Sequence, residues 1–168
     1  MNVKLLFPPL FNRPIVWLAS IGSVRLGVHL QDGWCLNMRG QTRLLSKSED
    51  MMPLLPLLEI GREQFYAHLY RVAQAVPELK EVSLSFPSIL LLIFAFESSA
   101  SDYWPLKALD WFDNEVSIDS KSHESLQFLL SQPKITQRLK QRVEKSIRYL
   151  QAKEKSQTTY HIPSPPTK

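Results

Sequence analysis

Apolar residues recur with helical spacing through the second half of the chain. Between Arg62 and Val76 they fall at steps of four, three and four, which places them on one helical face and predicts a helix that ends before Pro77. The same reasoning predicts shorter helices at about 87–98, 102–113 and 121–131. A last helix of about 18 residues is predicted from Gln132–Pro133 onward, and its apolar residues are Ile135, Leu139, Val143, Ile147 and Leu150.

The most hydrophobic segment is Ile89–Phe96, an unbroken run of eight apolar residues. A helix needs roughly 20 apolar residues to span a bilayer, and here Pro87 precedes the run and Glu97 closes it. The segment therefore predicts the central buried element of a soluble core, and no membrane association is expected.

The first part of the chain has patterns that two structures can satisfy. Val24–Leu30 alternates apolar and polar residues, Gln31–Gly33 suits a turn, and Trp34–Met38 alternates again, as in a β-hairpin. However, Trp17, Ile21, Val24 and Val28 also share a helical face, so the alternative is a helix that ends at Asp32–Gly33. The sequence leaves both open.

Two further segments have weaker patterns. Val82–Phe86 alternates apolar residues with serine and could form a strand fragment, although it runs directly into Pro87. Ser46–Pro56 has two prolines and a Ser/Glu/Asp cluster, which is typical of a loop.

These elements predict a mostly α fold. Sequential helices joined by short links pack antiparallel, so we expect a bundle or a short solenoid of antiparallel helix pairs, with a possible small N-terminal β-hairpin. A chain of 168 residues is near the usual size of one domain. We therefore expect a single helical domain over 1–152, followed by a polar, proline-rich tail over 153–168 that either stays flexible or lies extended against a partner.

Composition fits an intracellular globular protein. The chain has 44% hydrophobic residues, and its five glycines are few for an all-β fold with many tight turns. The single cysteine, Cys35, cannot form an internal disulfide, and the first residues do not have the pattern of a secretion signal. These features predict a cytoplasmic protein.

No catalytic or metal-binding motif is present in the sequence. The histidines His29, His68, His123 and His161 are far apart, and none lies three or four residues from another histidine or from the cysteine. Glycine-rich phosphate loops, dinucleotide fingerprints and the Gly-x-Ser-x-Gly elbow are also missing. We therefore expect no enzyme activity, no metal and no cofactor.

Charge is distributed unevenly. The net charge is +4, but Lys134–Lys155 has eight basic and two acidic residues, whereas Glu97–Glu124 has seven acidic and two basic ones. Opposite poles favour electrostatic steering of a partner. The acidic pole predicts a partner-binding site at Asp110, Trp111, Asp113, Glu115 and Asp119. The basic pole predicts an alternative nucleic-acid-binding site at Arg138, Arg142, Lys145 and Arg148.

Part of the second half resembles a known group of proteins. Phe86–Leu91, Ser101–Phe112 and Gln137–Arg142 resemble small bacterial helical proteins with HEAT-like helix pairs, in which a Tyr-Trp opens a helix and Ala-Leu-x-Trp closes it onto the previous one. The resemblance covers about residues 86–150. Some proteins of this group are immunity proteins that stand beside toxins.

Two functions follow as expectations. The first is a protein-binding module, specifically a bacterial immunity protein that neutralises one cognate toxin, such as a basic nuclease, by covering its active site with the acidic turn. The alternative is a nucleic-acid-associated accessory protein that uses the basic C-terminal helix.

Overall fold

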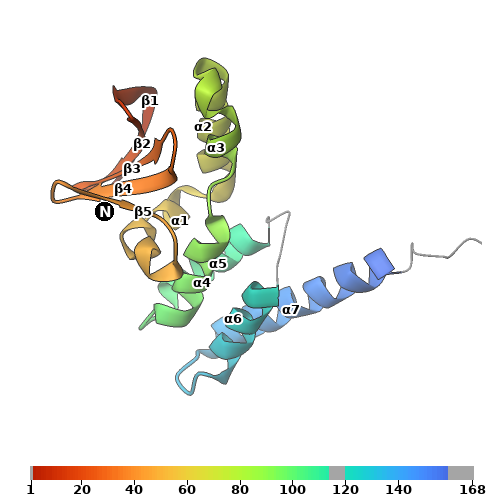
Figure 1. Ribbon diagram of the computed structural model, residues 1–168. Coiled ribbons are helices and arrows are strands. Elements are labelled where there is room, and N and C mark those ends of the chain that lie inside the picture. The colour runs from red at the N-terminus through yellow and green to blue at the C-terminus, as the bar shows by residue number, and fades with distance from the viewer. Residues whose placement is uncertain (1, 114–119, 159–168) are drawn as a thin grey trace, which may run out of the picture.

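A five-stranded antiparallel sheet precedes the helices in the computed structural model, which describes residues 2–113 and 120–158 (Figure 1). Neighbours in the sheet are neighbours in the chain, so the strands form a meander: β1 (Val3–Asn12), β2 (Ile15–Ile21), β3 (Val24–His29), β4 (Gly33–Met38) and β5 (Gln41–Leu44). The expected mostly α bundle or HEAT-like solenoid is therefore wrong, because the fold combines a sheet with helices. The expected hairpin exists only as part of this larger sheet.

β2 shows why the sheet is hard to recognise in the sequence. Its residues Val16–Ala19 are all buried, although successive side chains of a strand point to opposite faces of the sheet. A strand buried on both faces gives a continuous apolar run without alternation, which cannot be distinguished from a short helix by its period. Trp17 covers Gly27 of β3, where an added Cβ would lie 2.6 Å from the Trp17 ring and 2.5 Å from the Val16 carbonyl oxygen.

Residues 24–38 form a hairpin, as the first of the two alternatives predicted. β3 pairs with β4 in a register that places Val28 opposite Trp34. A further hairpin joins β4 to β5 through Arg39 and Gly40, which both have positive φ (53° and 79°). Two-residue hairpin turns favour this conformation, but arginine rarely adopts it, so the residue types do not indicate the turn.

β1 is an edge strand that contains two consecutive prolines. Its pairing with β2 shifts register between Leu5 and Leu10, so Pro8 and Pro9 lie where the ladder is irregular. Proline has no N–H to donate and is tolerated in sheets on edge strands and at bulges. The prolines interrupt the apolar pattern of the sequence but do not end the strand.

The segment that joins the sheet to the helices is more ordered than a loop. It contains a 3-10 helix, η1 (Ser48–Leu54), followed by α1 (Leu57–Ile60). The Oδ2 atom of Asp50 accepts hydrogen bonds from the backbone N–H groups of Ser46 and Lys47, at 3.0 and 3.1 Å. Because Met51 and Leu54 are fully buried, the segment contributes to the core.

Most helices agree with the predicted ones to within two residues. They are α2 (Arg62–Ala75), α4 (Ser88–Ser98), α5 (Tyr103–Phe112) and α6 (Ser120–Ser131). The possible strand at Val82–Phe86 is wrong, because a short 3-10 helix, η2 (Pro77–Leu79), leads into α3 (Lys80–Leu84).

The last helix, α7 (Gln137–Thr158), does not begin at Gln132–Pro133 as predicted but about four residues later, and it is longer than predicted. It continues past Ala152, so the first residues of the expected tail are helical. The rest of that tail, residues 159–168, lies outside the described residues.

One core joins the sheet to the helices. A chain of aromatic rings runs from Trp34 of β4 through Phe86 and Phe65 to Trp111 of α5, with centroids 5.0, 4.9 and 5.8 Å apart. The indole Nε1 of Trp34 also donates to the carbonyl of Val82, at 2.9 Å. Figure 1 shows the sheet and the α2–α3 pair at one end of the molecule and α6 and α7 at the other.

α4 lies at the centre of the helical part, against η1, α5 and α6. It belongs to the stretch Pro77–Ser98, which contains a window of 18 residues with mean hydropathy 1.7, apolar enough to cross a membrane by length and composition. Half of that window is buried inside the protein. Core helices of water-soluble proteins meet the same criterion, and the stretch is divided between η2, α3 and α4.

Candidate functional site

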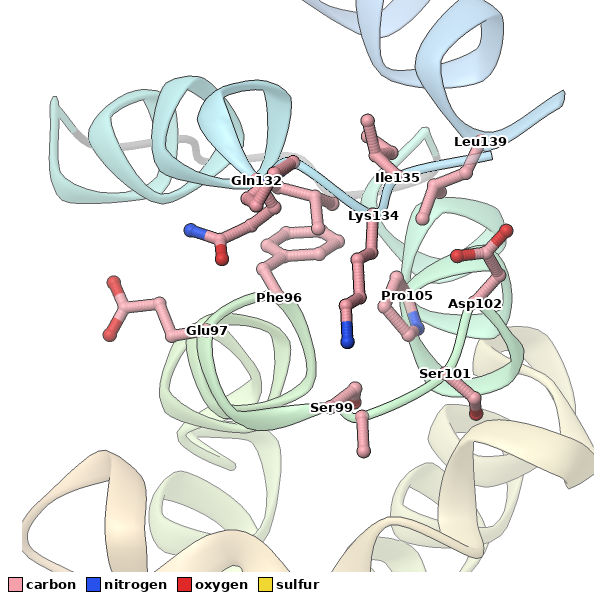
Figure 2. A pocket seen from close by; sticks show the side chains of 13 residues that line it. Phe96, Glu97, Ser99, Ser101, Asp102, Pro105, Gln132, Lys134, Ile135 and Leu139 are labelled. Atoms are coloured by element: carbon pink, nitrogen blue, oxygen red, sulfur yellow. The ribbon is translucent and has the colours of Figure 1, made fainter. Parts of the chain in front are cut away.

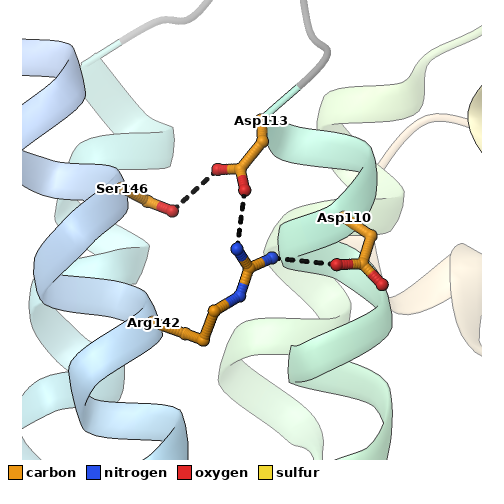
Figure 3. Close-up of polar contacts among 4 residues, drawn as sticks. All are labelled: Asp110, Asp113, Arg142 and Ser146. Carbon is orange, nitrogen blue, oxygen red and sulfur yellow. Dashed lines mark hydrogen bonds and ion pairs between the residues drawn. The ribbon is translucent and has the colours of Figure 1, made fainter.

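Residues of the two binding sites predicted from charge form hydrogen bonds with each other (Figure 3). Arg142 of α7 donates from Nη2 to the Oδ1 atom of Asp110, at 2.8 Å, and from Nη1 to the Oδ2 atom of Asp113, at 3.0 Å. Ser146, one turn further along α7, donates its hydroxyl to the Oδ1 atom of Asp113, at 2.8 Å. These bonds fasten the end of α5 to the middle of α7.

This network changes the interpretation of both poles. Asp110 and Asp113 belong to the predicted partner-binding site, and Arg142 belongs to the predicted nucleic-acid-binding site. The guanidinium of Arg142 forms ion pairs with both carboxylates. An arginine fork held between two carboxylates is geometrically fixed and has few donors left for a ligand. Asp110, Asp113 and Arg142 therefore have a structural role within this chain, and they are weak candidates for either site.

Trp111 is also unsuited to the role predicted for it. Its side chain is 1% exposed and packs on the ring of Phe65, so it belongs to the core and not to a partner-binding surface. Glu115 and Asp119, the other two residues of the predicted acidic site, lie outside the described residues.

The remaining basic residues of α7 do form an exposed stripe. Arg138, Lys145 and Arg148 are exposed, and their spacing of seven and three places them on one helical face. That face is opposite the buried face of the helix, which is formed by Leu139, Val143, Ile147 and Leu150. We call these three residues the basic stripe.

The buried histidine and the cysteine do not form a reactive pair. His68 of α2 is 8% exposed, and its Nε2 donates to the carbonyl of Leu18, at 2.9 Å. Burial lowers the pKa of His68, with Arg71 adding to the effect and the bond to Leu18 opposing it. Burial raises the pKa of the Cys35 thiol to about 11, which makes it a poor nucleophile at neutral pH. Within residues 2–113 and 120–158, no group of three His, Cys, Asp or Glu side chains could hold a metal ion.

A hollow of about 330 Å³ lies where α4, α5 and the α6–α7 connection meet (Figure 2). Phe96 and Pro105 form part of its apolar wall, and Figure 2 shows the Lys134 side chain extending into it. The carboxylate of Asp102 at its rim accepts a hydrogen bond from the Thr136 hydroxyl. A single lysine in such a hollow does not by itself supply an acid, a base or a nucleophile in a fixed position.

Exposed apolar side chains gather instead at the sheet end of the molecule. Four of them come from β1, α2 and α3, and we call them the apical surface: Phe7, Phe11, Tyr70 and Leu84. Tyr70 and Leu84 line a hollow of about 330 Å³ whose other walls are formed by Ala73, Gln74, Pro77 and Lys80.

Two contacts hold the strand side of the apical surface against its helix side. The guanidinium of Arg71 lies 3.6 Å from the centre of the Phe7 ring. Arg13, in the turn after β1, forms an ion pair with Glu78 of η2, at 3.6 Å. Sequence reasoning missed this surface because Phe7 adjoins prolines and because Tyr70 lies outside the apolar face of its helix.

Comparison with known protein families, with curated proteins and with solved structures finds no match to this chain. The functional argument therefore rests on the surfaces described above.

Proposed function

We propose that this protein is a binding module for one partner protein, which it recognises through the apical surface. The observation that carries the proposal is the hollow between α2 and α3 that exposed Tyr70 and Leu84 line, with exposed Phe7 of β1 held against Arg71 of the same helix α2. Contiguous exposed apolar side chains on a folded protein are typical of interaction sites. Aromatic residues, tyrosine above all, are also enriched among the residues that dominate binding energy.

The chemistry of this surface indicates what the partner presents. An apolar side chain of the partner would fill the hollow beside Tyr70 and Leu84. Arg71 and Lys80 lie next to these residues, so an acidic group of the partner would meet a basic rim. Apolar contact would provide most of the affinity and the charges would provide orientation.

The specific form of the proposal is a protein of the immunity type, which blocks a toxin by covering its active site. The charge-based form of this idea, with a free acidic turn at Asp110 and Asp113, loses support because Arg142 already occupies both carboxylates. Occlusion by the apical surface needs no such charge, since a bound protein excludes substrate by its volume.

The test begins with capture of the partner by the tagged protein from an extract of its native host, after nuclease treatment. Affinities are then measured with the purified partner and three variants. Tyr70→Ala and Leu84→Ala should each weaken binding about tenfold or more, which corresponds to about 1.4 kcal/mol. Tyr149→Ala is the matched control, because Tyr149 of α7 is 56% exposed and Tyr70 is 58% exposed. If Tyr149→Ala weakens binding and the two apical variants do not, the apical assignment is wrong.

The basic stripe supports a second candidate, an accessory protein that binds nucleic acid through α7. Arg138, Lys145 and Arg148 project away from the core on one face of this helix. Phosphate contacts release counterions, so affinity for a DNA or RNA duplex should fall linearly on a log–log plot against salt. Arg148→Ala should reduce the slope by about 1. Binding that is independent of salt, or unchanged in this variant, would exclude the stripe.

A further inference from the structure

The last strand of the sheet, β5, has one open edge. Within the described residues its sheet neighbour is β4, and it stands at the end of the strand order. All four of its residues, Gln41–Leu44, are exposed. An unpaired strand edge presents backbone groups that can pair with an extended segment of another chain.

The register shows which backbone groups of β5 point outward. Met38 pairs with Gln41 across the turn, and just beyond the strand the N–H of Leu45 donates to a carbonyl of β4, at 2.9 Å. Hydrogen-bonded and non-bonded pairs alternate along an antiparallel ladder. The peptide groups of Thr42 and Leu44 therefore point away from β4, so each offers an N–H and a C=O to a strand placed beside it.

The opposite edge of the sheet is unsuited to the same role. β1 contains Pro8 and Pro9, which have no N–H to donate, and its pairing with β2 is irregular at this point. β1 is also held against α2, where the guanidinium of Arg71 lies on the Phe7 ring. Because β5 contains no proline, a further strand is expected at its edge and not at β1.

The charges along this edge favour an acidic segment. Arg39, Arg43 and Lys47 are exposed, and no carboxylate lies between them in the chain. The next carboxylates are Glu49 and Asp50, and Asp50 already accepts backbone hydrogen bonds at 3.0 and 3.1 Å. An acidic side chain of a partner would therefore meet a basic edge.

The two faces of β5 differ in what they offer to an added strand. Leu44 is paired with Cys35 and is 47% exposed, so an apolar side chain of the added strand would cover it. Arg43 lies on the other face, where its Nη2 donates to the Oε1 atom of Gln41, at 3.4 Å. An acidic side chain directly opposite Arg43 would form a cross-strand ion pair. Because successive side chains of a strand alternate between its faces, the added segment should alternate acidic and apolar residues.

Arg43 also disfavours pairing of β5 with a second copy of this chain. In a symmetric antiparallel pair, the register that uses the outward groups of both Thr42 and Leu44 places one Arg43 directly opposite the other. Like charges directly opposite each other destabilise a sheet. The edge is therefore better suited to a chain of opposite charge.

We propose that β5 binds an extended acidic segment of a partner protein by antiparallel strand addition. The backbone of the segment pairs with Thr42 and Leu44, and its acidic side chains lie opposite Arg43. Because β5 and β1 are at opposite edges of the sheet, this surface is separate from the apical surface.

The test adds a blocked synthetic peptide of alternating valine and glutamate to the 15N-labelled protein at constant ionic strength. The amide signals of Thr42 and Leu44 should move downfield and saturate, because both N–H groups gain an acceptor. Two N-methylated peptides are the matched controls. In the proposed arrangement the valine amides face β5 and the glutamate amides face solvent, so methylation of the valines should abolish binding and methylation of the glutamates should preserve it.

A pair of charge reversals ties the effect to this edge. Arg43→Glu should weaken binding of the peptide about fivefold or more, since a favourable cross-strand pair becomes a repulsive one. Lys121→Glu makes the same change in net charge at an exposed position of α6 and should leave the affinity unchanged.

Three outcomes would overturn the proposal. Equal binding of the two methylated peptides would show that backbone pairing is not involved. Equal binding of a peptide with lysine in place of glutamate would show that charge does not select the ligand. If the signals of Thr42 and Leu44 instead move with protein concentration in the absence of peptide, the edge pairs with a second copy of this chain.

Discussion

Gly27 marks the tightest approach within the sheet. A methyl group at this position would lie 2.5 Å from the Val16 carbonyl oxygen and 2.6 Å from the Trp17 ring, and the carbonyl belongs to a paired strand that cannot move aside. We therefore expect Gly27→Ala to lower the free energy of unfolding by about 2–3 kcal/mol. Urea denaturation measures the change. Arg25→Ala, two residues earlier on the same strand and exposed, should change stability by less than about 0.5 kcal/mol.

His68 links α2 to the backbone of β2 and should make stability depend on pH. Burial lowers its pKa in the folded protein, so below about pH 6.5 the unfolded chain takes up a proton that the folded protein does not. The free energy of unfolding should therefore fall as the pH drops from 7 toward the folded pKa, with a limiting slope of about 1.4 kcal/mol per pH unit from this group. Urea titrations at several pH values, compared with His68→Gln, isolate the effect. An equal slope in the variant would assign the dependence to other groups.

At the scale of elements, the contact between α5 and α7 depends on Arg142. Replacing it with alanine removes the cation that Asp110 and Asp113 share and leaves Ser146 bonded to the Asp113 carboxylate without that cation. We expect Arg142→Ala to lower the free energy of unfolding by about 1–2 kcal/mol, discounted because Asp110 is largely exposed. Arg148→Ala is the matched control on the same helix and should have almost no effect. Equal losses in the two variants would mean that the network adds nothing to stability.

The same elements show which patterns could be interpreted from sequence. α2, α5 and α6 were predicted closely because each has one buried face, so its apolar residues keep a period of 3.6. α4 is an unbroken apolar run, and its bounds follow instead from Pro87 before it and the polar residues after it. β2 was missed because burial on both faces removed its alternation, and β1 because its prolines lie at a register shift that no local pattern reveals. The hairpin over 24–38 was one of two equal alternatives, since its apolar residues satisfy both periods.

The candidate site was harder to predict than the helices, for an electrostatic reason. Along the chain, the acidic and basic residues of the two predicted sites are about 30 positions apart. In the folded protein α5 lies against α7, so Asp113 and Arg142 cancel each other. The apical surface combines Phe7 with Tyr70, which are even more distant in sequence and join only because β1 packs beside α2. Nothing in the spacing of either segment indicates that contact.

At the scale of the whole molecule, the sheet and the helices should unfold together. The aromatic chain from Trp34 to Trp111 crosses from β4 to α5 within one continuous core, so neither part keeps a complete hydrophobic interior without the other. Small domains with one core usually unfold in a single cooperative transition. Leu26 of β3 is fully buried in this core, and Leu26→Ala should lower stability by about 2–4 kcal/mol.

The decisive measurement follows helix content by circular dichroism and tryptophan environment by fluorescence during urea unfolding. For the natural sequence and for Leu26→Ala the two midpoints should coincide, and the variant should shift both equally although the change lies in the sheet. Trp17 and Trp34 lie in the sheet, whereas Trp104 and Trp111 lie in α5. If the variant adds an earlier step to the fluorescence transition and leaves the helical midpoint in place, the sheet unfolds by itself. The apical surface would then be divided between two independent units, and a partner that binds it would stabilise their contact as well as their folding.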